Sequence, residues 1–410
     1  MSTNENNLNT EQSNNTPPKS NFKMLGVIAL ILVIGAVGFF ILNGNGKKGI
    51  EAHDAVFKAN KSLSKAKTLD ISGKISSDLK FENLSEKDIA EINEARAILD
   101  DASLNYALKM DKDNKKYFFN FGITKKDVNV DFNIYTDSEC IQIYIPQLSS
   151  KTLYFKWDDY AKLSKQYQLP QLHIKDYAKL FNLENSSSFA KIEKTYSDFY
   201  KNEFKNNIKI TNKNHIVNFD SKKYDTVEYT LTTNARKDEG YNEKLMNKLK
   251  NDPDVKEFII SKGEEFLEIA RANGDDKILE IPADYKFDTN ETRTEIDEFF
   301  DELINPSDNT KLGMNQKMDL VTNYRIDSDN KFRQILIKSH VNHIFPESGG
   351  TADMTFTNIF NVFALDEKIT IESPNPNNKL DLANATINDF IMLQEEIQNN
   401  VIKLSTLIPQ

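Results

Sequence analysis

Several short patterns place serine, lysine and aspartate at spacings that could support catalysis. Ser62 and Lys65 form a Ser-x-x-Lys pair, and Ser328-Asp329-Asn330 matches a second element of penicillin-recognising enzymes, in which the serine is the nucleophile. The Lys-Thr-Gly strand of those enzymes is absent from the sequence. A lysine follows Ser77 and Ser188 at the same spacing, so this lysine-rich composition produces the pair readily. We therefore predict no catalytic residues, and keep a hydrolase with an unrecognised site as the weakest alternative.

Two further patterns suggest metal ligands, and neither has the required geometry. His340 and His343 are three residues apart in a predicted strand, so they point to opposite faces. The Asp-x-Asp pairs at Asp111 and Asp327 resemble the start of a calcium loop, but both lack the glycine at position six and the glutamate at position twelve. Turn chemistry explains both aspartate pairs. We predict no metal site and no cofactor.

Cysteine content and charge exclude other classes. Cys140 is the only cysteine, so the chain has no intramolecular disulfide and no zinc site that needs two or four cysteines. It falls in a predicted strand, where it acts as a small buried side chain. Asp and Glu total 62 against 52 Lys and Arg, a net charge of −10 that argues against nucleic acid as a partner. The abundance of Asn and Ile is typical of a low-GC Gram-positive bacterium.

The strongest signal is the uncharged run Met24–Leu42. At 1.5 Å per residue a helix of this length is about 28 Å long, close to the roughly 30 Å hydrocarbon core of a bilayer. A cleaved signal peptide would have a shorter apolar region followed by small residues at the cleavage site. This run is longer, and the large residues Phe39-Phe40 and Ile41 stand at its end instead. A buried helix of a soluble domain is the other alternative. We predict an uncleaved signal anchor that binds the lipid bilayer.

The residues around this run predict the topology. We expect a disordered cytoplasmic tail (residues 1–23), the membrane span (24–42) and a linker (43–49). Lysines flank both ends of the span, and the short tail favours a cytoplasmic N-terminus in the bacterial cell membrane. Residues 1–48 carry four Lys and two Glu, a net charge of +2. Because the whole chain has a net charge of −10, the remainder has a net charge of −12. Anionic lipid repels so acidic a domain, which we place outside the cytoplasm.

Beyond the linker the hydrophobic period alternates between helical and two-residue spacing, which predicts an α+β fold with a curved antiparallel sheet and helices on its apolar face. Each strand is expected to have one dry and one wet face. Predicted helical segments are 50–66, 85–99, 158–206, 241–250, 253–272, 291–303 and 383–404. In the first, Ala55, Val56 and Ala59 lie on one apolar stripe. Ser85 and Asp88 form a capping box at the start of the second, and Pro253 and Gly274 mark the two ends of the helix 253–272. Predicted strands are 69–75, 104–110, 116–123, 127–135, 141–145, 153–157, 208–219, 226–233, 317–326, 332–344, 354–365 and 368–373.

The domain division leaves two alternatives open. Both halves contain an Asp-x-Asp-Asn-Lys hairpin turn, at Asp111 and Asp327. Residues 50–235 then form one α+β unit, and residues 236–410 form either a second, similar unit or a continuation of the same sheet.

The segment Lys67–Ile75, with its Ile-Ser-Gly-Lys-Ile core, follows a helix and precedes a meander. This layout resembles the LolA/LppX-like fold, in the form of membrane-anchored extracytoplasmic proteins of clostridia and related bacteria. The resemblance covers about residues 50–160 and, less closely, 310–405. It implies a half-open sheet, closed by helices, that encloses an apolar cavity for a lipid or lipoprotein acyl chain. The chain departs from the family in lacking a lipobox cysteine and in its long helical middle, so no functional residue is carried over.

These observations together favour a non-enzymatic, single-pass extracytoplasmic protein that binds an apolar ligand or an unknown protein partner in the envelope. A structural or regulatory partner protein with a filled core is the alternative.

Overall fold

The computed structural model describes most of the chain beyond the predicted linker. The described residues are 52–86, 88–89, 102–126, 128–167, 172–177, 180, 187–204, 206–219, 222–234, 239–286, 289–304, 317–344, 348–375 and 377–407. The predicted tail, membrane span and linker lie outside these ranges, as does most of the predicted helix 85–99. Among the helices in these ranges, none is both long and apolar enough to cross a bilayer.

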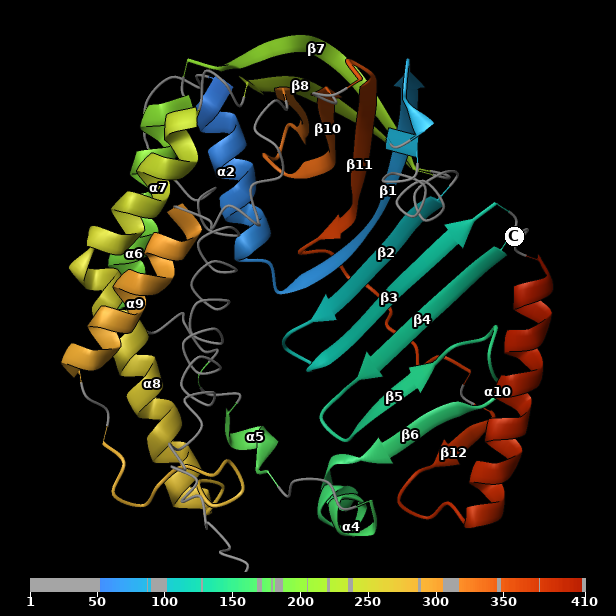
Figure 1. Cartoon of the computed structure of the whole chain (residues 1–410). Coiled ribbons are helices and arrows are strands. Elements are labelled where there is room, and N and C mark those ends of the chain that lie inside the picture. The colour runs from blue at the N-terminus through green and yellow to red at the C-terminus, as the bar shows by residue number, and fades with distance from the viewer. Residues whose placement is uncertain are drawn as a thin grey trace, which may run out of the picture.

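Twelve strands of the described residues form one open, curved sheet (Figure 1). The strands are β1 (Thr68–Glu82), β2 (Ala102–Asp111), β3 (Lys116–Lys125), β4 (Val128–Thr136), β5 (Cys140–Tyr144), β6 (Thr152–Lys156), β7 (Ile208–Phe219), β8 (Lys222–Asn234), β9 (Lys317–Asp327), β10 (Phe332–Ile344), β11 (Thr351–Leu365) and β12 (Lys379–Asp381). Their order is β12-β6-β5-β4-β3-β2-β1-β11-β10-β9-β8-β7. All neighbours are antiparallel except β12 and β6, so the sheet is mixed.

The centre of the sheet joins segments that are far apart in the sequence. β1 pairs with β2 on one side and with β11 on the other, in register from Leu69↔Leu365 to Glu82↔Thr351. Strands β2–β6 and β12 therefore form one arm of the sheet, β7–β11 form the other, and β1 joins the two. The boundary predicted between residues 235 and 236 falls between β8 and β9, which are hydrogen-bonded neighbours.

Alternation along the strands gives the sheet two chemically distinct faces. The register aligns Ile71 with Leu108 on β2, and Leu108 with Phe119 on β3, so these side chains lie on one face. On the other side of β1, Ile71 aligns with Val362. We call this the apolar face. The opposite, polar face carries residues such as Asn120.

Helix α2 (Ala52–Ser64) covers the apolar face over the second arm. The predicted helical stripe is confirmed, because Ala55, Val56 and Ala59 are all buried. They share one core with Val362 of β11 and Phe332 of β10. This burial of aliphatic and aromatic side chains fixes α2 against the sheet.

The glycine in the Ile-Ser-Gly-Lys-Ile segment has a packing role. The Tyr106 ring lies over Gly73 so closely that a Cβ atom there would overlap it. Crossing β1 in this way, the Tyr106 hydroxyl donates a hydrogen bond to Asn358 Oδ1 on β11, at 2.9 Å. The missing side chain at position 73 therefore lets one residue of β2 bind β11 across the central strand.

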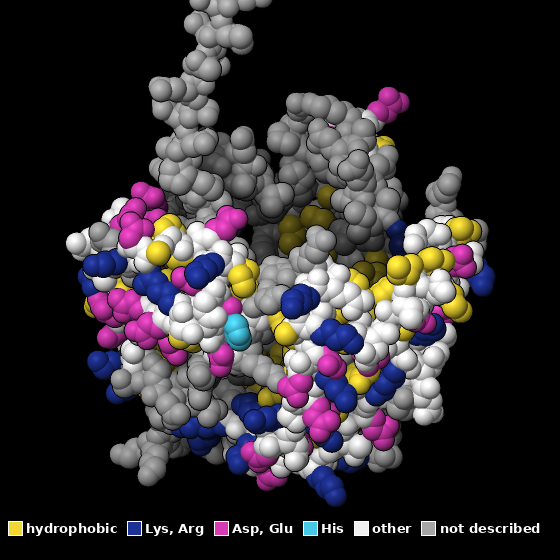
Figure 2. Space-filling model, turned by 90° about the horizontal axis from the view of Figure 1, so that it is seen from below, with side chains coloured by type: hydrophobic (Ala, Val, Ile, Leu, Met, Phe, Trp, Pro, Cys, Tyr) yellow, Lys and Arg dark blue, Asp and Glu magenta, His cyan; other side chains and the backbone are white. Residues whose placement is uncertain are grey.

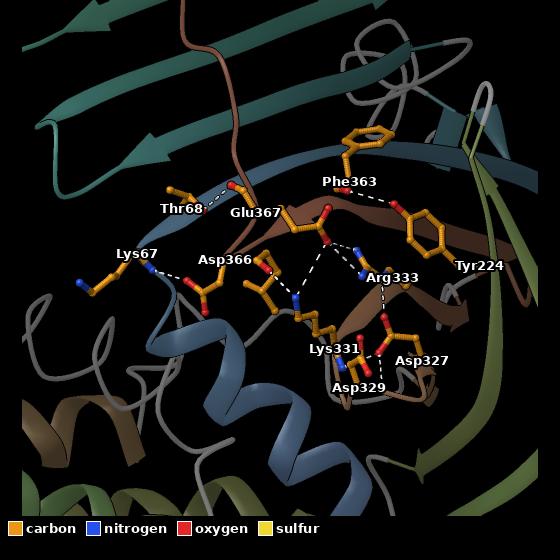
Figure 3. A network of polar contacts seen from close by, with 11 residues as sticks. Lys67, Thr68, Tyr224, Asp327, Asp329, Lys331, Arg333, Phe363, Asp366 and Glu367 are labelled. Atoms are coloured by element: carbon orange, nitrogen blue, oxygen red, sulfur yellow. Dashed lines mark hydrogen bonds and ion pairs between the residues drawn. The ribbon is translucent and has the colours of Figure 1, made fainter.

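A buried ion network holds the β9–β10 turn against the end of β11 (Figure 3). Arg333 is 4% exposed, and its Nε donates to Asp327 Oδ2 at 2.7 Å while its terminal nitrogens lie 3.2 Å from Glu367 Oε1. The guanidinium also lies 4.1 Å from the centre of the Tyr224 ring. Thr68, at the start of β1, donates to the Glu367 carbonyl at 2.7 Å. The network thus connects four strands, β1, β8, β9 and β10, and the turn that follows β11.

Most remaining helices form a bundle with its own core, seen on the left in Figure 1. The bundle helices are α6 (Ser187–Phe204), α7 (Glu239–Asn251), α8 (Pro253–Asn273) and α9 (Thr289–Ile304). The other described helices are α4 (Tyr160–Gln166), α5 (Ile174–Tyr177) and α10 (Ile387–Leu407), with a 3-10 turn at Trp157–Asp159. Tyr196, Leu249, Val255 and Phe300, from α6, α7, α8 and α9, are fully buried together. The predicted Pro253 start and Gly274 end of α8 are confirmed, with Gly274 in the left-handed region.

One predicted strand is wrong. Residues 368–373 form no strand, although the alternation of Ile369 and Ile371 suggested one. The chain turns at Asp366, whose φ is 54°, and then crosses the polar face. Ile371 is buried there against Tyr135 and Cys140. The alternation therefore reflects packing onto the sheet, not pairing within it.

The last helix begins later than predicted. Residues Asp381 to Asn384 form a turn, and α10 starts at Ile387 and not near Ala383. Thr386 caps it, since the Asp389 amide donates to Thr386 Oγ1 and the Thr386 amide donates to Asp389 Oδ2. The same reciprocal cap predicted between Ser85 and Asp88 is confirmed.

A buried carboxylate anchors the C-terminal end of α8. Asp275 is fully buried and accepts hydrogen bonds from the His173 amide at 3.0 Å and from the Tyr177 hydroxyl at 2.9 Å. Its other oxygen lies 2.8 Å from His173 Nδ1. Burial opposes the charged form, but these hydrogen bonds together outweigh it and lower the pKa of Asp275.

We expect Asp275→Asn to destabilise the fold by about 1–3 kcal/mol at pH 7, because it replaces an acceptor that holds three donors. A lowered pKa means that the carboxylate stabilises the fold above the unfolded-state pKa, about 3.9, and that this contribution is lost as the pH falls further. Urea unfolding should therefore show a constant difference from pH 7 to about pH 5 that shrinks below about pH 4. Asp276→Asn, one residue away, is the matched control.

We expect Gly73→Ala to destabilise the fold by about 1–3 kcal/mol, because the added methyl group displaces the Tyr106 ring. In a Tyr106→Ala background the same change should cost almost nothing, since the obstructing ring is gone. Urea unfolding of the four proteins in this double-mutant cycle measures the coupling. Equal costs in both backgrounds would show that the ring does not explain the glycine.

Candidate ligand-binding face of the sheet

The two arms of the sheet differ in what covers their apolar face. Over β1 and β11, beneath α2, Leu69 is 4% exposed and Val362 is 0% exposed. On β3, in the other arm, Tyr117 is 37%, Phe119 39% and Ile123 52% exposed. No described helix lies in front of β2–β5 in Figure 1. The same face is therefore dry in one arm and open to solvent in the other.

This open area is continuous across three strands. The register places Leu104 of β2, Ile123 of β3 and Val130 of β4 side by side, and Tyr106, Phe121 and Phe132 form the next row. We call this area, across β2, β3 and β4, the open apolar face. Figure 2 shows hydrophobic side chains in a recess between the helical side of the molecule and the sheet.

The opposite side of the same strands is more enclosed. Amide side chains bond across the strands there, as Asn120 Nδ2 does to Asn133 Oδ1 at 2.9 Å. Residues 369–373 lie over β5, where Ser373 and Gln142 are hydrogen-bonded. The expectation that the apolar side of each strand is the buried one is thus wrong for β3. The apolar Phe119 is 39% exposed, whereas the polar Asn120 on the other side is half-buried. The alternation of residue types was predicted, but which side is covered was not.

The open apolar face offers contact surface and almost no reactive chemistry. Its polar groups are the hydroxyls of Tyr106, Tyr117 and Thr136 and, at the end of β3, the ammonium group of Lys125. Burial raises the pKa of Tyr106, more than the hydrogen bond with Asn358 lowers it, so the hydroxyl stays protonated at neutral pH. Contiguous exposed apolar side chains in a soluble domain usually mark a binding surface. This arrangement can bind an apolar group by contact and desolvation.

The structure does not unite the serine and lysine patterns into a catalytic site. Ser62 lies on α2, and its hydroxyl donates to the Lys58 carbonyl at 3.1 Å. Ser328-Asp329-Asn330 forms the predicted β9–β10 turn, where the Asp329 amide donates to Asp327 Oδ1. His340 and His343 lie three residues apart on β10, where the backbone register aligns them with Thr355 and Ala352 of β11. The described residues contain no group of three or more His, Cys, Asp or Glu that could hold a metal ion.

A second recess lies on the polar face. It has a volume of about 340 Å³ and is lined by Lys109, Phe118, Thr370 and Glu372. Lys109 is already paired with Asp70, at 3.3 Å. Because its walls carry charges of both signs, this recess suits a small polar molecule better than an acyl chain.

Comparison with known proteins adds no family to this description: no protein-family model matches the sequence, and no curated protein matches it either.

Proposed function

We propose that the protein is a membrane-anchored, extracytoplasmic binding protein without enzymatic activity, and that its ligand is an apolar molecule held on the open apolar face. The observation that carries this proposal is the exposure of Phe119 and Ile123 on a face that α2 buries elsewhere. Exposed apolar area costs about 25 cal/mol per Å² relative to burial. A bound apolar ligand would remove that cost.

The layout supports the same class of ligand. An open, curved sheet with a helix on one half of its apolar side is the kind of architecture that the LolA/LppX-like resemblance implies. The resemblance implies that such a sheet, closed by helices, encloses an apolar cavity for a lipid or a lipoprotein acyl chain. The acidic remainder of the chain and the uncharged run Met24–Leu42 fit a domain tethered beside a bilayer yet repelled from its surface.

We expect native mass spectrometry of the full-length, detergent-extracted protein to detect a co-purifying lipid. Ile123→Lys should abolish that adduct, because a charge on the open apolar face opposes contact with an apolar ligand. Ile216→Lys is the matched control, since Ile216 is also exposed, at 43%, but lies on the edge strand β7.

A clean apo mass for the wild-type protein, or equal lipid retention in both variants, would contradict this prediction. Those results would favour the alternative of a structural or regulatory partner protein.

Deleting residues 24–42 should release the protein from the membrane fraction, because this run is the only one in the sequence that we predict to span the bilayer. Added protease should digest the bulk of the wild-type chain in intact protoplasts, as expected for an extracytoplasmic domain. Immunoblotting of fractionated cells measures both. Full-length wild-type protein in the soluble fraction, or protection of the large domain in protoplasts, would contradict the anchor or its orientation.

A further inference from the structure

Helix α10 is apolar on two sides, and its own domain covers only one of them. On the inner side Leu393 is buried, and the Phe390 ring lies 5.7 Å from that of Tyr167. Asn400 donates to the Leu148 carbonyl at 2.9 Å, and Glu396 accepts hydrogen bonds from Ser149 and Ser150. These contacts fix the orientation of the helix, so its outer side is held toward solvent.

The outer side carries five exposed large hydrophobic residues, the largest such group on any described element. Ile387 is 79% exposed and Ile402 is 61% exposed. The others are Ile391, Met392 and Val401. Figure 2 shows hydrophobic side chains at the surface of the end of the molecule that α10 occupies.

Most of these residues follow the spacing of a helix–helix seam. Positions 387, 391, 394, 398, 401 and 405 are separated by alternating steps of four and three, which is the heptad pattern of packed helices. The seam holds Ile387 and Ile391 at one end, Gln394 and Gln398 in its middle, and Val401 and Ser405 at the other end. It carries no charge.

The pattern is self-complementary about a two-fold axis, as an interface between identical copies must be. In an antiparallel pair of helices, Ile391 faces Val401 of the second copy, and Gln394 faces Gln398 of the second copy. Ile391 and Val401 then form an apolar pair at each end, Ile387 lies level with Ser405 of the second copy, and each glutamine amide meets an amide that can both donate and accept. We propose that the chain forms a two-fold dimer through antiparallel packing of the outer sides of α10.

A lipid surface fits this helix less well. Helices that lie on membranes are rich in Lys and Arg on their polar side, which attracts anionic lipid. α10 has one cation, Lys403, against Asp389, Glu395 and Glu396. Glu395 flanks the seam and faces Glu395 of the second copy in the antiparallel arrangement, so like-charge repulsion weakens the dimer without preventing it.

Cysteine cross-linking of the full-length protein tests the arrangement directly. We expect an oxidised mixture of Ile391→Cys and Val401→Cys proteins to form a disulfide-linked dimer, while neither variant alone does so. The native Cys140 is buried and can stay in place if free thiols are blocked before denaturation. Cross-linking of Ile391→Cys with itself, or no cross-link in the mixture, would overturn the antiparallel dimer.

Analytical ultracentrifugation in detergent supplies the second measurement. Ile391→Lys should raise the dimer dissociation constant by about 100-fold, because each dimer loses two buried isoleucines. Glu395→Gln should lower it by roughly twofold, since it removes the repulsion at the axis. Met392→Lys is the control: it is 60% exposed but lies off the seam, so the dissociation constant should not change. An equal effect of Ile391→Lys and Met392→Lys would overturn the proposed seam.

Discussion

The antiparallel pairing of β1 with β11 is the constraint on which the rest of the fold depends. It joins a strand near residue 70 to one near residue 360, and so makes one sheet of two arms. Tyr106 reinforces the joint from β2 by reaching across Gly73 to Asn358, and the Arg333 network fixes one end of it. Such long-range pairing carries a large loop-closure cost, which the buried side chains beside it must offset.

The same pairing determines where the apolar face is left open. α2 runs directly into β1, so it can cover only the strands next to that point, and its core residues contact β7–β11 and the start of β1. The arm formed by β2–β6 extends away from α2. After β11 the chain crosses to the polar face, with Ile371 on Tyr135, and leaves Phe119 and Ile123 exposed on the other. Chain connectivity, and not residue type, thus selects the open surface.

This explains which features the sequence predicts and which it does not. Local signals succeed where the chain alone decides: the period of β4, the Ser85 cap and the Pro253 and Gly274 ends of α8 all depend on nearby residues. The strand predicted at residues 368–373 is wrong because an alternating pattern indicates contact with a surface. That contact can be with a neighbouring strand or, as here, with an underlying sheet face. The exposure of the open apolar face could not be predicted for a related reason. Ile71 and Ile123 both lie in strands of alternating hydrophobicity, and only the position of α2 distinguishes them.

The two exposed apolar surfaces suit different occupants, and the proposed anchor connects them. The open apolar face is broad and aromatic, with Lys125 at its edge, whereas the α10 seam is narrow and has two glutamines between its apolar residues. A seam with two glutamines at its centre and a facing pair of Glu395 residues gives a weak contact in free solution. A membrane tether confines the copies to a thin layer and raises their effective concentration, so a weak contact suffices there. The same seam would leave the chain monomeric while it is dilute, which limits the aggregation that such exposed side chains otherwise favour.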